Sequence, residues 1–88
     1  MTTHTTTVTI ASSQGLHARP AAELVEAMKG FDSSVRILVG EKKADTKSIM
    51  SVLALGAASG AEATIEAEGP QAEEAMAAAV AILSTEEG

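Results

Sequence analysis

Apolar and polar residues alternate along three stretches of the chain, and this period of two is typical of half-buried β-strands. The first stretch covers residues 5–12, where Val8 and Ile10 fall on one face and threonines on the other. Two later stretches alternate in the same way, and their apolar positions are Val35, Ile37 and Val39, then Ala63, Ile65 and Ala67. The pattern therefore predicts at least three strands that each turn one face to a core.

Helical spacing separates these strands. After the first strand, apolar residues at i, i+3, i+4 and i+7 predict a helix over Ala18–Lys29; they are Ala21, Leu24, Val25 and Met28. Pro20 falls in its first turn, where a missing N–H costs no hydrogen bond, and Gly30 ends it. Gly69-Pro70 opens a final helix with a similar apolar stripe, which consists of Ala72, Ala75, Met76, Ala79, Val80 and Leu83.

The middle of the chain predicts a hairpin and a short helix. Gly40-Glu41 is typical of a tight turn, because glycine supplies the unusual backbone dihedral. A short strand over Lys42–Asp45 would follow this turn. Residues 48–55 have the spacing of a two-turn helix that ends at Gly56.

The predicted element order is β-α-β-β-α-β-α. This order favours the α+β class, as an open-faced β-sandwich whose four-stranded antiparallel sheet is covered on one face by three helices. A chain of 88 residues suits a single domain over residues 1–88.

Composition narrows the classes of function. A formal net charge of −6 argues against nucleic acid as the main partner, because phosphate binding needs a basic face. With no cysteine, disulfides, thiol catalysis and cysteine metal sites are excluded. The N-terminus lacks a secretory pattern, and no apolar run approaches the roughly 20 residues that span a bilayer. We therefore expect a cytoplasmic protein that does not insert into the membrane.

The segment from Gly15 to Pro20 carries the candidate chemistry. His17 lies where a strand ends and a helix begins, so the first helical amides, those of Ala18 and Arg19, would point at an anion. Gly15 lets the backbone turn sharply into this place. The Arg19 guanidinium adds a planar cation that suits phosphate.

This environment favours a nucleophilic histidine. Positive potential disfavours the imidazolium, so the His17 ring stays neutral, and the same potential stabilises a phosphoryl group that has arrived. A solvated helix cap is an equally good interpretation of the residues alone. No carboxylate or serine completes a hydrolytic triad, and we predict no cofactor. The other histidine, His4, falls in a polar tail, where we expect it to be inert, and no metal site is predicted.

Two motifs of this chain resemble those of the HPr family, the histidine-containing phosphocarriers of the bacterial sugar phosphotransferase system. The active-site signature of that family is similar to Gly15-Leu16-His17-Ala18-Arg19-Pro20-Ala21-Ala22. Its regulatory-serine segment is similar to Lys47-Ser48-Ile49-Met50-Ser51-Val52-Leu53, and Gly60 and Glu68-Gly69 also fall at family-like places. The likeness runs nearly end to end and includes the element order.

The resemblance implies a specific activity. His17 would take a phosphoryl group on Nδ1 from enzyme I, which obtains it from phosphoenolpyruvate, and pass it to sugar-specific IIA proteins or domains. Arg19 matches the active-site arginine of the family. Such a protein is a monomeric carrier rather than an enzyme, because it has no turnover of its own.

The second motif has a structural and a regulatory interpretation. Ser48 is placed to cap the short helix, and the resemblance adds that a serine kinase phosphorylates the matching serine in some bacteria, as part of carbon catabolite regulation. Pattern alone favours burial of Ile49, Met50 and Leu53, but the resemblance implies that they form an exposed docking patch. The cations expected to ring this patch are Arg19, Lys29, Lys43 and Lys47.

Some residues depart from the family, and two alternatives stay open. Glu26 stands where many relatives have a partner-facing lysine, and alanines in the fourth strand replace bulkier residues. One alternative is a regulatory paralogue in a nitrogen-linked or transcriptional phosphorelay. The other is a passive anion-binding or scaffolding module whose His17 is never phosphorylated.

Overall fold

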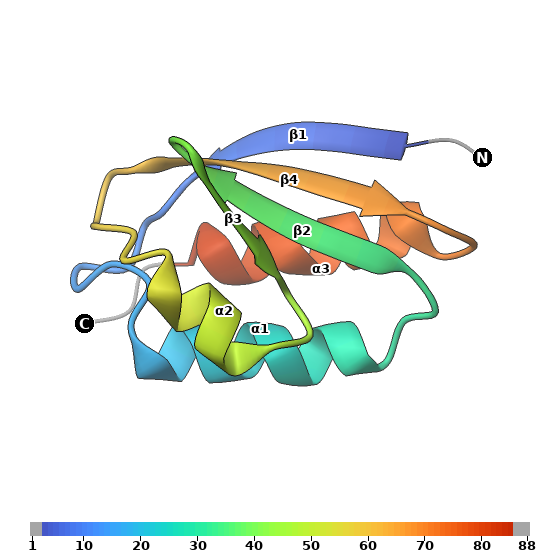
Figure 1. The fold of residues 1–88 in the computed structure, drawn as a ribbon, viewed down its shortest axis with the longest axis horizontal. Helices are drawn as coiled ribbons and strands as arrows, with labels where there is room; N and C mark the ends of the chain where they lie inside the picture. Colours follow the sequence, from blue (N-terminus) through green and yellow to red (C-terminus); the bar gives the residue numbers. More distant parts are fainter. Residues whose placement is uncertain (1–2, 86–88) are drawn as a thin grey trace.

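The computed structural model describes residues 3–85, and its elements follow one another in the predicted order (Figure 1). They are β1 (Thr3–Thr9), α1 (Ala18–Lys29), β2 (Ser34–Val39), β3 (Lys42–Asp45), α2 (Ile49–Ala54), β4 (Glu62–Glu68) and α3 (Ala72–Leu83). The predicted bounds of α1 and β3 agree with the structure residue for residue.

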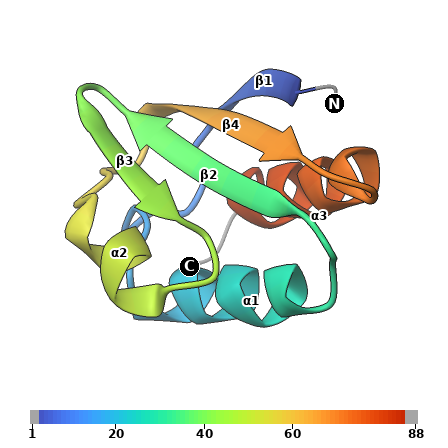
Figure 2. The same ribbon diagram turned by 45° about the vertical axis from the view of Figure 1, so that its right-hand side comes forward.

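The strands form one sheet in the order β1-β4-β2-β3, and every neighbouring pair is antiparallel. The three helices lie against the same face of this sheet, and the opposite face is open (Figures 1 and 2). The structure therefore has the predicted open-faced β-sandwich architecture of the α+β class.

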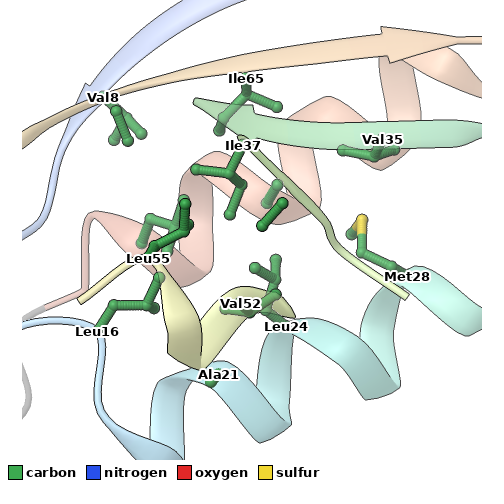
Figure 3. Close-up of a cluster of buried hydrophobic side chains, with 14 of the residues drawn as sticks. Val8, Leu16, Ala21, Leu24, Met28, Val35, Ile37, Val52, Leu55 and Ile65 are labelled. Carbon is green, nitrogen blue, oxygen red and sulfur yellow. The ribbon is translucent and has the colours of Figure 1, made fainter. Parts of the chain in front are cut away.

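The core lies between the covered face of the sheet and the helices (Figure 3). Ile37 of β2 and Ile65 of β4 are direct cross-strand partners, and both are fully buried. Leu24 and Met28 of α1 close the core from the helical side with no exposed surface. The alternation and the helical spacing in the sequence therefore meet in one apolar layer, as the period of each element requires.

The first strand is displaced from its predicted position. It begins at Thr3 and ends at Thr9, because β4 offers partners from Glu68, opposite Thr3, to Glu62, opposite Thr9. The prediction that His4 lies in a polar tail is therefore wrong. His4 is a half-buried residue of β1 opposite Ala67.

The stripe predicted for α3 is divided by depth. Its buried members are Ala72, Ala75, Ala79 and Leu83. Met76 and Val80 are half-buried and pack against the edge of the core. Three alanines and Leu83 therefore form the buried face of α3, and Met76 and Val80 form its margin.

Candidate functional site

His17 is the N-cap of α1, as the sequence predicts. Its backbone is extended, with φ −89° and ψ −170°, and its Nδ1 accepts a hydrogen bond from the Arg19 N–H at 3.4 Å. A ring nitrogen that accepts a hydrogen bond carries the lone pair, so the tautomer that fits this contact has its proton on Nε2. The nucleophilic nitrogen of His17 therefore faces the first turn of α1.

The first turn of α1 can hold an anion. The Ala21 N–H donates to the His17 carbonyl at 3.1 Å, and Pro20 has no N–H. The amides of Ala18 and Arg19 are then the two that can point at a ligand. No acidic side chain lies in this turn, so nothing there opposes the positive end of the helix dipole.

The surroundings of the two ring nitrogens differ. Within residues 3–85, Nε2 of His17 is enclosed and has no hydrogen-bond partner, whereas Nδ1 meets the helix amide. Arg19 is exposed at the second position of α1. The structure thus brings a nucleophilic nitrogen, two amides and a guanidinium to one end of α1, and this set can receive and hold a phosphoryl group.

The loop before His17 is held in place by a segment that the sequence analysis missed. Gly15 has φ +73°, which agrees with the predicted sharp turn, and the Leu16 N–H donates to the Ala57 carbonyl at 2.9 Å. Ala57 itself is buried between α2 and β4. The signal in the sequence was the pair of glycines on either side of it, Gly56 and Gly60, which both adopt a positive φ.

The second motif forms the predicted capped helix. Ser48 is the N-cap of α2, and its hydroxyl accepts a hydrogen bond from the Ser51 N–H at 3.3 Å. Met50 is 73% exposed and Ile49 is 37% exposed, whereas Val52 is fully buried. The helix therefore has one face in the core and one open to partners.

The exposed apolar patch is narrower than the one predicted from the resemblance. Leu53 is half-buried and packs against the core, since it lies beside Val52 on a helix of only six residues. We call the exposed pair Ile49 and Met50 the α2 patch.

The four cations predicted to ring the patch come from three parts of the chain: α1, β3 and the turn before α2. Lys47 lies beside the α2 patch, and its Nζ donates to the Phe31 carbonyl at 3.1 Å, where the chain leaves α1. Lys29 pairs with Glu26 at 3.4 Å, at the end of α1 opposite to His17. The 12 residues of α1 span about 18 Å at about 1.5 Å per residue.

Lys43 lies on β3, at its border with α2. It directly precedes the buried Ala44, and it lines a hollow together with Ser51 and Ala54 of α2 and the C-cap Leu55. Arg19 therefore lies beside His17, Lys29 and Lys47 lie at or near the C-terminal end of α1, and Lys43 borders α2.

In the part of the chain that the structure describes, no three His, Cys, Asp or Glu side chains are grouped so that they could hold a metal ion. None of the helices described is both long and apolar enough to cross a membrane.

The amino-acid sequence and the structure are both similar to those of known phosphocarrier proteins. The family described as PTS HPr component phosphorylation site matches residues 4–85. The chain is 42% identical over 80 residues to phosphocarrier protein NPr of Escherichia coli K12, covering 90% of this chain and 89% of that protein. It is 42% identical over 76 residues to phosphocarrier protein HPr of Vibrio cholerae, covering 86% and 89%.

A solved structure agrees with the computed one along most of its length. Phosphocarrier protein HPr from Bacillus anthracis is 34% identical and has a TM-score of 0.88, covering 92% of this chain and 96% of that chain. The matched region includes His17 with its helix and the whole second motif. From this agreement in motifs, element order and three-dimensional fold, we conclude that the chain belongs to the HPr family of phosphocarrier proteins.

Proposed function

We propose that this chain accepts a phosphoryl group on His17 from phosphorylated enzyme I and passes it to sugar-specific IIA proteins or domains. The observation that carries this proposal is the contact of His17 Nδ1 with the Arg19 N–H at the start of α1. In the transfer, Nδ1 gives its lone pair to phosphorus, the bond between phosphorus and the donor breaks, and its electron pair leaves with the donor. The phosphoryl group would then lie at the positive end of α1.

The same surroundings make the transfer reversible. The amides of Ala18 and Arg19 would bind the phosphoryl oxygens, and the Arg19 guanidinium would balance their charge. In the proposed mechanism these groups stabilise the phosphorylated ring, and no step activates water to cleave it. We therefore propose a carrier rather than an enzyme, with no cofactor.

Net charge and the α2 patch support protein partners. With a formal net charge of −6, the chain is poorly suited to nucleic acid, while Lys47 beside the exposed Met50 suits an acidic partner surface. We propose that enzyme I and the IIA partner dock here in turn, on a monomer in the cytoplasm. A serine kinase and phosphatase acting on Ser48 would be regulatory partners.

A second candidate function is a nitrogen-linked phosphorelay. It is favoured by the relative named NPr, which is as similar to this chain, at 42% identity, as the relative named HPr. The chemistry at His17 would be the same in both relays, and only the partners would differ.

One assay tests the chemistry of the proposal. The wild-type chain, phosphoenolpyruvate and a sugar-system enzyme I should yield a protein with one added phosphoryl group by intact mass, labile in acid and stable in base. His17→Ala should gain none and keep its fold. His4→Ala is the matched control, since it removes the other histidine of the chain, and it should be phosphorylated normally.

The same assay with a nitrogen-system enzyme I distinguishes the two relays by their relative rates. Faster transfer from the nitrogen-system enzyme would reject the sugar relay in favour of the second candidate. No phosphorylation by either enzyme would leave the passive anion-binding module as the better account.

A further inference from the structure

We propose that the backbone carbonyl of Ala57 positions the His17 ring, and that Gly15 is the residue through which it acts. This inference deepens the proposed function and rests on it for the reaction. Ala57 follows α2, which ends at Ala54 with Leu55 as its C-cap, and it lies far from His17 along the chain.

The first contact is a buried hydrogen bond. The Leu16 N–H donates to the Ala57 carbonyl at 2.9 Å, and the two residues are only 4% and 7% exposed. Water has little access to such a bond, so it holds its geometry more firmly than one at the surface. The residue directly before His17 is therefore fixed to the segment after α2.

The second contact is a close backbone approach. A Cβ atom at position 15 would lie 2.4 Å from the Ala57 carbonyl oxygen and 3.0 Å from Ala58 Cα. Both are backbone atoms, so neither can move aside as the end of a long side chain could. Gly15 also has φ +73°, so glycine is required here for its conformation and for its lack of a side chain.

These contacts reach His17 through the backbone. The His17 N–H donates to the Gly15 carbonyl at 3.0 Å, so the N-cap is tied to the same glycine that rests on Ala57. In this backbone position Nδ1 meets the Arg19 N–H, so a shift of the N-cap backbone would move the ring relative to that amide.

The support behind Ala57 is itself anchored. The Gly60 N–H donates to the Ile10 carbonyl at 2.8 Å, and the Ile10 N–H donates to the Ala61 carbonyl at 2.9 Å. The loop between α2 and β4 is thus joined to the chain on the other side of the His17 loop. A misplacement of about 1 Å at a reacting group can cost about a hundredfold in rate, so such a support matters for transfer.

A pair of glycine variants tests the proposal. Gly15→Ala introduces the clash with Ala57, while Gly40→Ala is the matched control, because its φ of +61° is also unfavourable for alanine but nothing lies within 4 Å of its added Cβ. Two readouts are compared: the rate of phosphorylation, with phosphoramidate and with enzyme I as donors, and the ¹⁵N resonances of the His17 ring. Phosphoramidate is a small donor that needs no docking surface.

We expect Gly15→Ala to be phosphorylated about ten- to a hundredfold more slowly than Gly40→Ala by both donors, with a shifted Nδ1 resonance. Equal rates in the two variants would overturn the proposal. Slowing with enzyme I alone would overturn it too, since the effect would then lie in docking and not in the ring.

A backbone variant covers the case in which Gly15→Ala does not fold. In a synthetic chain, an ester in place of the Gly15–Leu16 amide removes the Leu16 N–H, which donates to the Ala57 carbonyl. It also weakens the Gly15 carbonyl as acceptor for the His17 N–H, so both links between Ala57 and His17 are loosened and the same slowing and resonance shift are expected. If the wild-type chain accepts a phosphoryl group from neither donor, the proposed function fails. The positioning of the His17 ring is then tested by its ¹⁵N resonances alone. An unchanged Nδ1 resonance in the ester variant would then refute it.

Discussion

At the scale of single residues, the two histidines differ in their local surroundings. His17 has an extended N-cap backbone, an Nδ1 that faces a helix amide and an enclosed Nε2. His4 lies inside the strand β1 and does not cap a helix. Spacing in the sequence identified His17 as the candidate, because glycine before it and proline after it mark a helix start. Which ring nitrogen faces the helix could not be read from spacing.

Arg19→Ala should slow phosphoryl transfer in both directions by roughly tenfold or more, because it removes a charge-assisted contact to the phosphoryl group. The variant should fold normally, since Arg19 is exposed. Rates of transfer from enzyme I and to a IIA partner, measured beside a thermal melt, test both statements.

Arg19→Lys is the control for this prediction. It keeps the charge but loses the planar fork, so it should recover only part of the rate. A full rate in Arg19→Ala would mean that the helix amides suffice and that Arg19 takes no part.

At the scale of elements, α2 joins a structural face and a docking face within six residues. Val52 points into the core, Met50 points away from it, and Ser48 supplies the cap at the start. The hydrophobic pattern alone could not tell which apolar residues of α2 are buried, because a helix of fewer than two turns is too short to show a clear periodicity. The position of the sheet and of α1 decides it.

Ser48→Asp should keep or raise the melting temperature while it slows phosphorylation of His17 by enzyme I. An acidic N-cap accepts from the first-turn amides and meets the positive end of the helix, so folding is not harmed. The same charge lies at the margin of the α2 patch and next to Lys47, where it repels an acidic partner. Because the repulsion is electrostatic, the slowing should shrink at high salt.

Ser48→Ala separates capping from charge. It should lose up to about 1 kcal/mol of stability with its hydrogen bond to the Ser51 N–H, yet transfer at a near-normal rate. Transfer at the full rate in Ser48→Asp would leave Ser48 as a cap only. Unfolding of Ser48→Asp would contradict the placement of the helix start.

Met50→Asp should weaken binding to enzyme I with little change in the melting temperature, because Met50 is 73% exposed. Val52→Asp on the same helix is the contrasting variant, and burial of its unpaired carboxylate should cost roughly 3 kcal/mol or more. A binding titration and a thermal melt of both variants test this division of α2. A collapsed melt of Met50→Asp would show that the α2 patch is part of the core.

At the scale of the whole molecule, small side chains let α3 lie close to the sheet. Ala75 and Ala79 of α3 and Ala63 and Ala67 of β4 are all fully buried. A layer of such residues leaves little spare volume, since protein interiors are close-packed.

Ala75→Leu should therefore destabilise the protein by about 1–3 kcal/mol, because the larger side chain forces α3 away from the elements it packs against. Ala77→Leu is the matched control, since Ala77 is exposed on the same helix, and its effect should be small. Urea unfolding of the two variants gives the comparison. Equal stability would mean that the packing around Ala75 is loose enough to accept a leucine.

Most of the fold could be predicted from the sequence, because hydrophobic period is a local property of the chain. Alternation gave the strands, helical spacing gave α1 and α3, and the Gly40-Glu41 turn gave the hairpin that carries β3. The ends of α1 were predicted correctly because their signals, His17 before the helix and Gly30 after it, stand next to the helix itself.

The chain by itself thus determined the kind and order of its elements and the residue that starts α1, through signals between neighbours. Only the tertiary structure decided where β1 begins, since β4 supplies the partners that draw Thr3 and His4 into the sheet. It likewise decided that Ala57 supports the turn at Gly15, because a backbone hydrogen bond between distant segments leaves no mark on side-chain pattern. Contacts of this kind depend on how the elements pack, and packing is fixed only when all of them share one core.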